Sequence, residues 1–399
     1  MLRVEMLCTG DEVLHGQIID TNAAWLADYL FQQGLPMTSR MTVGDDLDAL
    51  VTAITQRSQI ADILIVNGGL GPTSDDLSAL AAATAAGEGL VEHAEWLARM
   101  EAFFAERGRV MAPSNRKQAQ IPASAEMVDN PVGTACGFAL QLNKCLMFFT
   151  PGVPSEFKVM VDQQIMPRLR ERFAVADAPL CLRLTTFGRS ESDLASQLDG
   201  MALPPGVVLG YRSSMPIIEL KLTGPAAQQE NMEQLWETVR TVAGENTIFE
   251  GTEVLPAQLA RRLAERDMTL AVSEHFTAGL LNWQLQSANT PLVGGELLAK
   301  VEDTDTSLSG LADYARHLAE RQGASLALVV GNRNDAELSL ALHTPEGSFA
   351  QTIQFNVQRY SLKTHQEVVA MLAMNMLRRW LNGWSVYGGH GWITVLKTL

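Results

Sequence analysis

The sequence predicts an α/β protein with three domains, at residues 1–170, 171–250 and 251–399. Three observations support this fold class. Short apolar runs in the first third end in small or Gly-rich turns before helix-like sequence resumes, the middle region has runs in the order β-α-β-β-α, and the last third again alternates helices with strands. A chain of 399 residues can form two or three hydrophobic cores, because single domains commonly have roughly 100–200 residues.

The predicted N-terminal strands are residues 2–8, 62–66 and 145–149, and an amphipathic stretch at 22–33 predicts a helix between the first two. Alternating strands and helices predict a parallel sheet with right-handed connections. The loops that follow parallel strands gather at one edge of the sheet, where ligands usually bind. We therefore expect three loops that are distant in the sequence to line one crevice.

The second of these loops reads Gly-Gly-Leu-Gly-Pro-Thr at residues 68–73. Because glycines lack a Cβ atom and adopt positive φ angles, such a backbone can approach a ligand closely, and a loop before a helix can direct N–H groups at an anion. Asp75 and Asp76 follow the loop and allow two interpretations. Ser74 or Asp75 caps the next helix while Asp76 favours its dipole, or both carboxylates bind a divalent metal ion that bridges to phosphate.

Other carboxylates stand in the loops that are expected to meet at this crevice. They are Asp11, Glu12, Asp20, Asp45, Asp46 and Glu156. Each one alone is explained by a helix cap or a solvated loop, whereas together they would supply oxygen ligands for a magnesium-like ion and a group that positions water. Lys117 offers a cation for a pyrophosphate, or is a surface lysine.

The middle region has predicted strands at 180–188, 207–211 and 217–222 and predicted helices at 190–198 and 226–242. It contains no cluster of nucleophiles or carboxylates, so a spacer or dimerisation element is the favoured interpretation.

The last third predicts a helix at 255–265, a strand at 268–272, a helix from Thr277, a strand at 326–330 and a helix at 366–381. The apolar residues of the final helix are expected to form a packing face, and they are Met371, Leu372, Met374, Met376, Leu377 and Trp380. Residues 384–399 are left unassigned.

The composition excludes several classes of protein. The formal net charge of −15, without a Lys/Arg run, disfavours nucleic-acid binding. No apolar stretch reaches the roughly 20 residues of a membrane helix, and the N-terminal run is interrupted by Glu5, which predicts a strand and not a signal peptide. The four cysteines form no C-x-x-C pair, so we expect a reducing cytoplasm and no structural zinc site.

Successive motifs in the first 154 residues resemble the N-terminal domain of the CinA (competence/damage-inducible) family. They are residues 9–12, 16–17, 20–22, 43–46, 68–73 with 75–76, 115 with 117–119, 130 with 133–135, 137–138 and 151–154. The resemblance implies a molybdopterin-binding-like fold and metal-dependent hydrolysis of ADP-ribose to AMP and ribose 5-phosphate. It also implies a KH-type middle domain and a homodimer. The family usually has Thr and a basic residue soon after the Asp pair, where this chain has Ser78 and Ala79.

Roles for individual residues follow from the loops and from this resemblance. Asp75, Asp76 and Lys117 are the predicted catalytic residues, and Asp45 and Asp76 are the predicted ligands of a divalent metal ion. The predicted substrate-binding residues are Thr9, Gly10, Asp20, Asn22, Gly68, Gly69, Gly71, Thr73 and Gly152. Among these, Gly68–Thr73 is assigned to phosphate, and Asp20 and Asn22 are assigned to ribose or base.

The C-terminal third resembles the family's nicotinamide-mononucleotide deamidase domain, but its catalytic positions differ. His275 stands where the family has the nucleophilic Ser of an Ala-Glu-Ser-x-Thr-Gly-Gly motif. Ala299 replaces the family's catalytic Tyr, Thr304 replaces its Lys, and residues 331–335 replace a Gly-rich phosphate loop. A nucleophile without a hydroxyl or thiol cannot form the usual acyl intermediate, so amide hydrolysis is expected to be lost.

Three functions are compatible with these patterns. The first is hydrolysis of ADP-ribose or a related nucleotide pyrophosphate, with a divalent ion and AMP as product. The second is a binding module that holds a nucleotide or molybdopterin-like ligand without turnover. The third is residual deamidation of nicotinamide mononucleotide, which would depend on His275.

Overall fold

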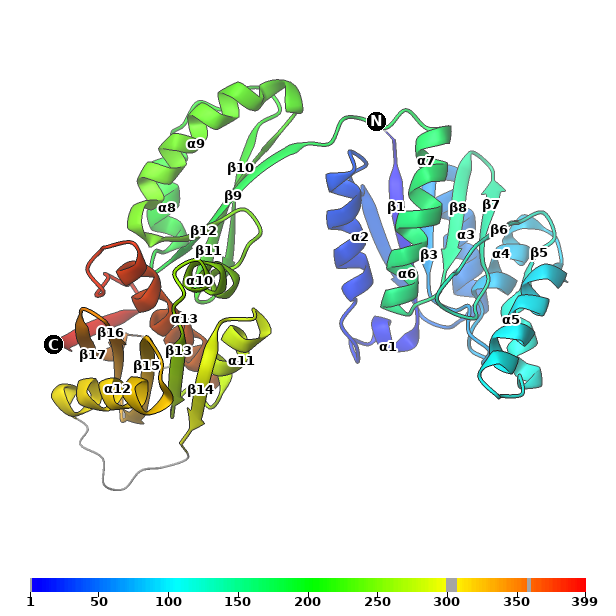
Figure 1. Cartoon of the computed structure of the whole chain (residues 1–399). Helices are drawn as coiled ribbons and strands as arrows, with labels where there is room; N and C mark the ends of the chain where they lie inside the picture. Colours follow the sequence, from blue (N-terminus) through cyan, green and yellow to red (C-terminus); the bar gives the residue numbers. More distant parts are fainter. Residues whose placement is uncertain (1, 299–306, 357–359) are drawn as a thin grey trace. The chain divides into compact units, whose positions relative to one another are not determined.

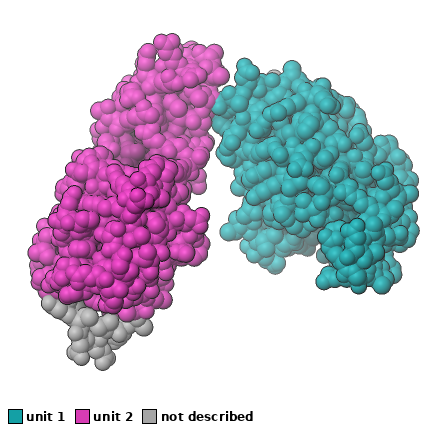
Figure 2. Space-filling model, viewed as in Figure 1, with its two compact units in different colours: residues 1–179 teal, residues 180–399 magenta. Residues whose placement is uncertain are grey.

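A computed structural model describes residues 2–298, 307–356 and 360–399 of the chain. The chain forms two compact units, Met1–Pro179 and Leu180–Leu399 (Figure 2). Both units combine helices with β-sheets, so the predicted α/β class is confirmed. The division into three domains at residues 170 and 250 stays a prediction. No described helix is long and apolar enough to span a membrane.

The first unit has a six-stranded sheet with the order β2-β1-β3-β8-β7-β6. Strands β1 (Val4–Thr9), β2 (Ser39–Val43), β3 (Ile63–Asn67) and β8 (Cys145–Thr150) are parallel to one another. This confirms the parallel arrangement that was predicted for β1, β3 and β8. Strands β7 (Gly137–Leu142) and β6 (Glu126–Val128) are antiparallel to their neighbours. The prediction of an entirely parallel sheet was therefore wrong. Residues 143 and 144 join β7 to β8 as a two-residue hairpin, which only antiparallel strands permit.

Helices cover both faces of this sheet (Figure 1). Helices α3 (Leu47–Ile60), α4 (Ser78–Ala86) and α5 (Ala94–Glu106) share one hydrophobic core with the sheet, and α2 (Thr21–Gln32), α6 (Pro154–Met160) and α7 (Met166–Arg172) share the other. Because side chains alternate along a strand, Leu64 and Val66 enter the first core while Ile63 and Ile65 enter the second. The central strands are thus buried on both faces, and their carboxyl ends are where a ligand can bind.

Smaller elements complete the first unit. They are α1 (Asp11–Leu14), the 3₁₀ helix η1 (Pro113–Ala119), the strand pair β4 (Leu90–Glu92) and β5 (Gln120–Pro122), and the π-helical turn η2 (Val161–Ile165). Helix α1 directly follows β1, and η1 precedes β5.

The second unit begins with a four-stranded sheet in the order β10-β11-β9-β12. Its elements are β9 (Leu180–Phe187), α8 (Glu191–Leu198), β10 (Val208–Ser214), β11 (Ile217–Gly224), the 3₁₀ turn η3 (Ala226–Gln228), α9 (Gln229–Ala243), the 3₁₀ turn η4 (Gly244–Asn246) and β12 (Thr247–Glu250). The sequence predicted the β-α-β-β-α order but not the short strand β12.

A six-stranded sheet with the order β14-β13-β15-β16-β17-β18 follows. Its strands are β13 (Leu270–Glu274), β14 (Leu292–Leu297), β15 (Leu326–Asn334), β16 (Glu337–Thr344), β17 (Gly347–Phe355) and β18 (Ile393–Thr398). The helices around it are α10 (Leu255–Ala264), α11 (Leu280–Ser287), α12 (Leu308–Gln322) and α13 (Leu362–Leu381). Strand β18 lies in the tail that the sequence left unassigned.

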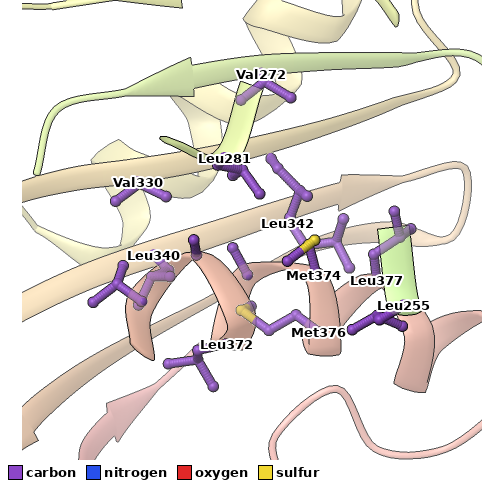
Figure 3. Packing of buried hydrophobic residues seen from close by; sticks show 14 of the residues in the cluster. Leu255, Val272, Leu281, Val330, Leu340, Leu342, Leu372, Met374, Met376 and Leu377 are labelled. Carbon is purple, nitrogen blue, oxygen red and sulfur yellow. The ribbon is translucent and has the colours of Figure 1, made fainter. Parts of the chain in front are cut away.

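The terminal helix α13 supplies the core of this unit. Leu372, Met374, Met376 and Leu377 are fully buried among leucines and valines of the sheet (Figure 3), and Met371 and Trp380 pack against the same cluster. The predicted packing face is therefore present. Phe187 of β9 and Ile248 of β12 belong to this cluster as well, so it includes residues of both sheets of the second unit, whereas α8 and α9 pack on the four-stranded sheet in a separate cluster.

Candidate functional site

The loops after β1, β3 and β8 line one cavity of about 520 Å³ at the carboxyl ends of these strands. Most of the residues predicted for the site line it, and they are Thr9, Gly10, Asp20, Asn22, Asp45, Gly68, Gly69, Gly71, Asp75, Asp76 and Gly152. Glu12 and Glu156 line it too. The structure thus brings together residues from segments up to about 140 positions apart, as expected of a parallel sheet edge.

Two predicted residues, Thr73 and Lys117, are not among the residues that line the cavity. The Lys117 ammonium on η1 donates a hydrogen bond to the Thr73 carbonyl oxygen. Lys117 therefore stabilises the conformation of the glycine loop through its bond to Thr73.

The glycine loop turns sharply as it leaves β3, because Gly68 has a φ of 107° and Gly69 a φ of 69°. A Cβ atom at Gly69 would lie 2.3 Å from the Ser78 hydroxyl oxygen. That hydroxyl donates to the Gly68 carbonyl oxygen at 2.7 Å, so Ser78 fastens the loop to the first turn of α4. The family's hydroxyl at this position is retained here in a structural role.

Asp75 and Asp76 do not cap the following helix. Helix α4 begins only at Ser78, and Leu77 occupies its N-cap position without a side-chain hydrogen bond. The expectation that Ser74 or Asp75 caps the helix was wrong, because Asp76 closes a turn with Thr73 before the helix starts. Asp76 Oδ2 accepts hydrogen bonds from the Thr73 amide at 2.9 Å and the Thr73 hydroxyl at 2.5 Å.

Glycine is required at position 71 because of this turn. A Cβ atom at Gly71 would lie 2.4 Å from Asp76 Oδ2. Gly71 therefore makes room for the Asp76 carboxylate, whereas the sequence alone assigned this glycine to phosphate contact. Gly152 differs, since a Cβ atom there would meet only the Gly68 Cα atom, at 3.6 Å.

Like charges gather around Asp45. The Asp11 amide donates to Asp45 Oδ2 at 3.0 Å, and the Asp45 amide donates to Asp11 Oδ1 at 3.2 Å. Burial raises the pKa of Asp45, and the negative charges of Asp11, Glu12 and Asp75 raise it further, against the lowering by the Asp11 amide. Asp45 and Asp75 both line the cavity, and the charge of Asp75 is the smallest of the contributions that raise the pKa of Asp45.

Two other predicted carboxylates are helix caps. Asp20 Oδ1 accepts from the Ala23 amide at 2.9 Å at the start of α2, and Asp46 Oδ1 accepts from the Ala49 amide at 2.8 Å at the start of α3. Asp20 lines the cavity as well. The pKa of the Cys8 thiol is raised, first because the thiol is buried and second because of its hydrogen bond with Asp20. Asp46 does not line the cavity.

Glu156 is held at the cavity by a buried asparagine. Asn130, 1% exposed, donates to Glu156 Oε2 at 2.8 Å and to the Ala135 carbonyl oxygen at 3.0 Å. Its own carbonyl oxygen accepts from the Gly133 amide at 3.0 Å. The Glu156 carboxylate consequently has a fixed position in the first turn of α6.

Sequence reasoning missed Asn67, the last residue of β3 and a lining residue. Asn67 Nδ2 donates to the Pro151 carbonyl oxygen at 2.7 Å and to Thr150 Oγ1 at 3.2 Å, and its Oδ1 accepts from Asn22 Nδ2 at 3.0 Å. The signal that could have indicated it is an amide residue immediately before the glycine pair, at the end of an otherwise apolar strand.

Within the described residues no three His, Cys, Asp or Glu side chains form a group that could enclose a metal ion. Asp45 and Asp75 instead both line the cavity, so their carboxylates are available to an ion bound there. Magnesium is commonly bound by one or two carboxylates together with waters and substrate phosphates. The donor set thus fits an ion that is shared with a phosphate, and not a closed protein site.

The degenerate deamidase positions lie in the second unit. His275 directly follows β13, burial lowers the pKa of its imidazole, and its Nδ1 has no hydrogen-bond partner among the described residues. Ala299 and Thr304 lie outside the described residues.

Glu274, beside His275, is 1% exposed and is used for structure. Its carboxylate accepts from the Thr277 hydroxyl at 2.6 Å and from the amides of Leu281 and Asn282 at 3.0 and 2.7 Å. It thereby satisfies the N–H groups at the start of α11, so this acidic residue stabilises the loop even without a serine nucleophile next to it.

Comparison with known proteins agrees with this architecture. Residues 5–171 match the family described as "Probable molybdopterin binding domain", which defines the class of the first unit. Over 402 residues the chain is 64% identical to a "CinA-like protein" of Escherichia coli (strain SE11) and to the "NMN amidohydrolase-like protein YfaY" of Escherichia coli (strain K12). Each alignment covers 100% of this chain and 99% of the relative. The chain belongs to the CinA-like protein family.

Solved structures resemble parts of the chain. The protein CinA with unknown function from Thermoplasma acidophilum is 29% identical, with 43% of this chain and 96% of that chain covered and a TM-score of 0.38. A competence or damage-inducible protein from Enterobacter asburiae is 15% identical, with 32% of this chain and 96% of that chain covered and a TM-score of 0.29.

Proposed function

We propose that the cavity of the first unit binds a nucleotide pyrophosphate of the ADP-ribose type and hydrolyses it to AMP with a divalent metal ion. The observation that carries this proposal is the convergence of a glycine loop with the carboxylates of Asp45 and Asp75 around one cavity. Its volume of about 520 Å³ lies in the range of roughly 300–1,000 Å³ of small-molecule sites.

The chain's own residues would divide the work as follows. The backbone of Gly68 and Gly69 allows close approach of the phosphates, while Asp76 and Lys117 hold that loop in shape through their hydrogen bonds with Thr73. Asp45 and Asp75 would hold the divalent ion, which when bound neutralises charge on the pyrophosphate oxygens. Glu156, fixed by Asn130, is the candidate to orient the attacking water and to accept its proton.

The acidic pair explains why an ion is needed. Without a cation, Asp45 and Asp75 would repel a pyrophosphate. Asp45 and Asp75 would hold a divalent ion, whose charge would offset this repulsion and the effect of the neighbouring negative charges that raise the pKa of Asp45.

We propose further that the second unit has lost amidohydrolase activity. A relative's name refers to NMN amidohydrolase, so residual deamidation of nicotinamide mononucleotide is the alternative function. His275 supplies an imidazole with a lowered pKa, but no hydroxyl or thiol for an acyl intermediate.

One set of incubations tests these proposals. Full-length protein is incubated with ADP-ribose or nicotinamide mononucleotide, each with Mg²⁺, Mn²⁺ or EDTA, and products are identified by mass. We expect AMP and ribose 5-phosphate only with a divalent ion. Saturable binding of ADP-ribose without AMP would instead establish a binding module. Ammonia released from nicotinamide mononucleotide, and abolished by His275→Ala, would establish residual deamidase activity.

Two variants sharpen the assignment. Asp75→Asn should lower ADP-ribose turnover about tenfold or more, because it removes a charge from the ion site. Asp76→Asn should also lower turnover, because it weakens the turn with Thr73. Unchanged metal-dependent turnover in both variants would refute the site.

A further inference from the structure

Two buried polar atoms in the cavity of the first unit have no hydrogen-bond partner among the described residues. They are Thr9 Oγ1 and Asn22 Oδ1. Thr9 is 5% exposed and Asn22 is 6% exposed, and both line the cavity. Buried polar atoms in native proteins almost always have a partner, so an unpaired pair inside a ligand-sized cavity indicates groups that a ligand satisfies.

The direction of the Asn22 amide follows from its neighbours. Thr150 Oγ1 donates to the Val66 carbonyl oxygen at 3.0 Å, so it accepts from Asn67 Nδ2, which also donates to the Pro151 carbonyl oxygen. Asn67 therefore has only its Oδ1 left for Asn22. This side-chain network fixes which atom Asn22 can present.

Asn22 Nδ2 uses both of its hydrogens, one for Asn67 Oδ1 at 3.0 Å and one for the Gly152 carbonyl oxygen at 2.8 Å. The opposite amide orientation would place two acceptors against each other at Gly152 and again at Asn67. Asn22 Oδ1 is consequently the atom left over, and it can only accept a hydrogen bond.

The ligand group that meets Asn22 must therefore be a donor. A phosphate oxygen or a carboxylate cannot satisfy it, whereas a hydroxyl can. The Thr9 hydroxyl lies at the end of the neighbouring strand, 2.7 Å from the position of a Cβ atom on Gly68. It can donate or accept. Both side chains are anchored beside the end of β3, Thr9 next to Gly68 and Asn22 on Asn67, so we infer that they serve neighbouring hydroxyls of one ligand.

Asp20, which the sequence assigned to ribose, is less suited to this contact. Its Oδ1 already accepts from the Ala23 amide, and its carboxylate also bonds to the Cys8 thiol. The unpaired atoms belong to Asn22 and Thr9 instead.

We propose that Thr9 and Asn22 form a subsite that selects ligands by the cis-diol of the nucleoside ribose. The subsite rests on the proposed binding of nucleotides in this cavity. It gives the cavity a second recognition element, which distinguishes ribonucleotides from their dideoxy analogues independently of the phosphates.

Isothermal titration calorimetry of the full-length protein with Mg²⁺ tests the subsite without turnover. The probes are α,β-methylene-ADP, whose bridge resists hydrolysis, and its 2′,3′-dideoxy form. Two hydrogen bonds of ordinary strength predict that the dideoxy probe binds about 10- to 100-fold more weakly.

Thr9→Val is the informative variant because the hydroxyl it removes has no described protein partner and the side chain keeps its shape. We expect unchanged or higher thermal stability, an approximately 3- to 10-fold weaker affinity for α,β-methylene-ADP, and unchanged affinity for the dideoxy probe. Thr9→Ser, which keeps the hydroxyl, should restore the discrimination. The discrimination that remains in Thr9→Val measures the contribution of Asn22.

The outcomes separate the two proposals. Equal affinity of the wild-type protein for both probes would overturn the diol subsite while nucleotide binding stands. Discrimination that Thr9→Val leaves untouched would overturn the assignment to Thr9. Failure of both probes to bind at millimolar concentration would overturn nucleotide binding in the cavity and the subsite with it.

Discussion

Replacing Asp45 by Asn should stabilise the first unit while it impairs the metal-dependent function. Asp45 lies among the negative charges of Asp11, Glu12 and Asp75, and burial together with these charges raises its pKa. Asn keeps the shape of the side chain, and its carbonyl oxygen can still accept from the Asp11 amide, now 3.0 Å from Asp45 Oδ2. The substitution therefore removes repulsion without removing the hydrogen bond.

The increase in the free energy of unfolding on Asp45→Asn can be estimated from the number of like charges near Asp45. Each of three partly solvated carboxylates contributes a few tenths of a kcal/mol, which gives about 0.5–1 kcal/mol in total. For a unit of this size, about 1 kcal/mol shifts Tm by roughly 2–4 °C, so Asp45→Asn should raise Tm by about 1–4 °C at neutral pH. High salt should reduce the difference, because it screens the repulsion.

The pH dependence has a defined sign. Because folding raises the Asp45 pKa above its ordinary value of 3.8, the folded state binds the proton more tightly than the unfolded state. The contribution of Asp45 to the stability of the wild type should fall as pH rises through the window just above 3.8, and then remain level. This part of the profile should be flatter in Asp45→Asn.

Differential scanning calorimetry with and without Mg²⁺ checks the prediction. Mg²⁺ should raise the Tm of the wild type and have a smaller effect on Asp45→Asn. Asp48→Asn is the matched control, since Asp48 is exposed in the first turn of α3 and the substitution removes a charge that favours the helix dipole. A lower Tm for Asp45→Asn than for the wild type, at low salt and without Mg²⁺, would refute the reasoning.

Three further substitutions test other parts of the structure. Gly152→Ala should keep Tm within about 2 °C of the wild-type value, since the added Cβ meets only Gly68 at van der Waals distance. The same substitution should weaken nucleotide binding several-fold in calorimetric titrations, because it narrows the cavity. Glu274→Gln should destabilise the second unit by about 2–3 kcal/mol in urea unfolding, because in either orientation its amide N–H₂ faces a backbone N–H, that of Leu281 or that of Asn282. An unchanged midpoint would contradict the assigned hydrogen bonds. Ala278→Gly should stabilise the same unit by about 0.5–1 kcal/mol, because Ala278 has a φ of 52° and glycine relieves that strain at some entropic cost. A loss of stability would argue against the left-handed turn.

Local patterns in the sequence predicted the strands that end at the site. Strands β1, β3 and β8 are short apolar runs followed by glycine or proline, and residues buried on both faces of a sheet leave such a signal. The hairpin of β16 and β17 was missed because Glu337–Thr344 and Gly347–Phe355 mix polar with apolar residues, and the turn at 345–346 has no Asn-Gly or Asp-Gly pair.

The site was predicted at the level of loops and not of individual contacts. The sequence indicated which loops would meet, because parallel strands place their carboxyl ends at one edge. It could not show that Lys117 binds the Thr73 carbonyl oxygen or that Asn22 bonds to Asn67, since these pairs are 44 and 45 positions apart and depend on side-chain packing. The packing of Gly71 against Asp76 and the helix cap made by Asp20 could not be predicted for the same reason.

The most direct test of the proposed hydrolase measures AMP released from ADP-ribose as Mg²⁺ is titrated into the full-length wild type and Asp45→Asn. We predict AMP release that rises with Mg²⁺ to saturation in the wild type, and a strongly reduced rate with a higher Mg²⁺ requirement in the variant. Equal, Mg²⁺-independent rates in both proteins, or no AMP from the wild type at any Mg²⁺ concentration, would contradict the proposal.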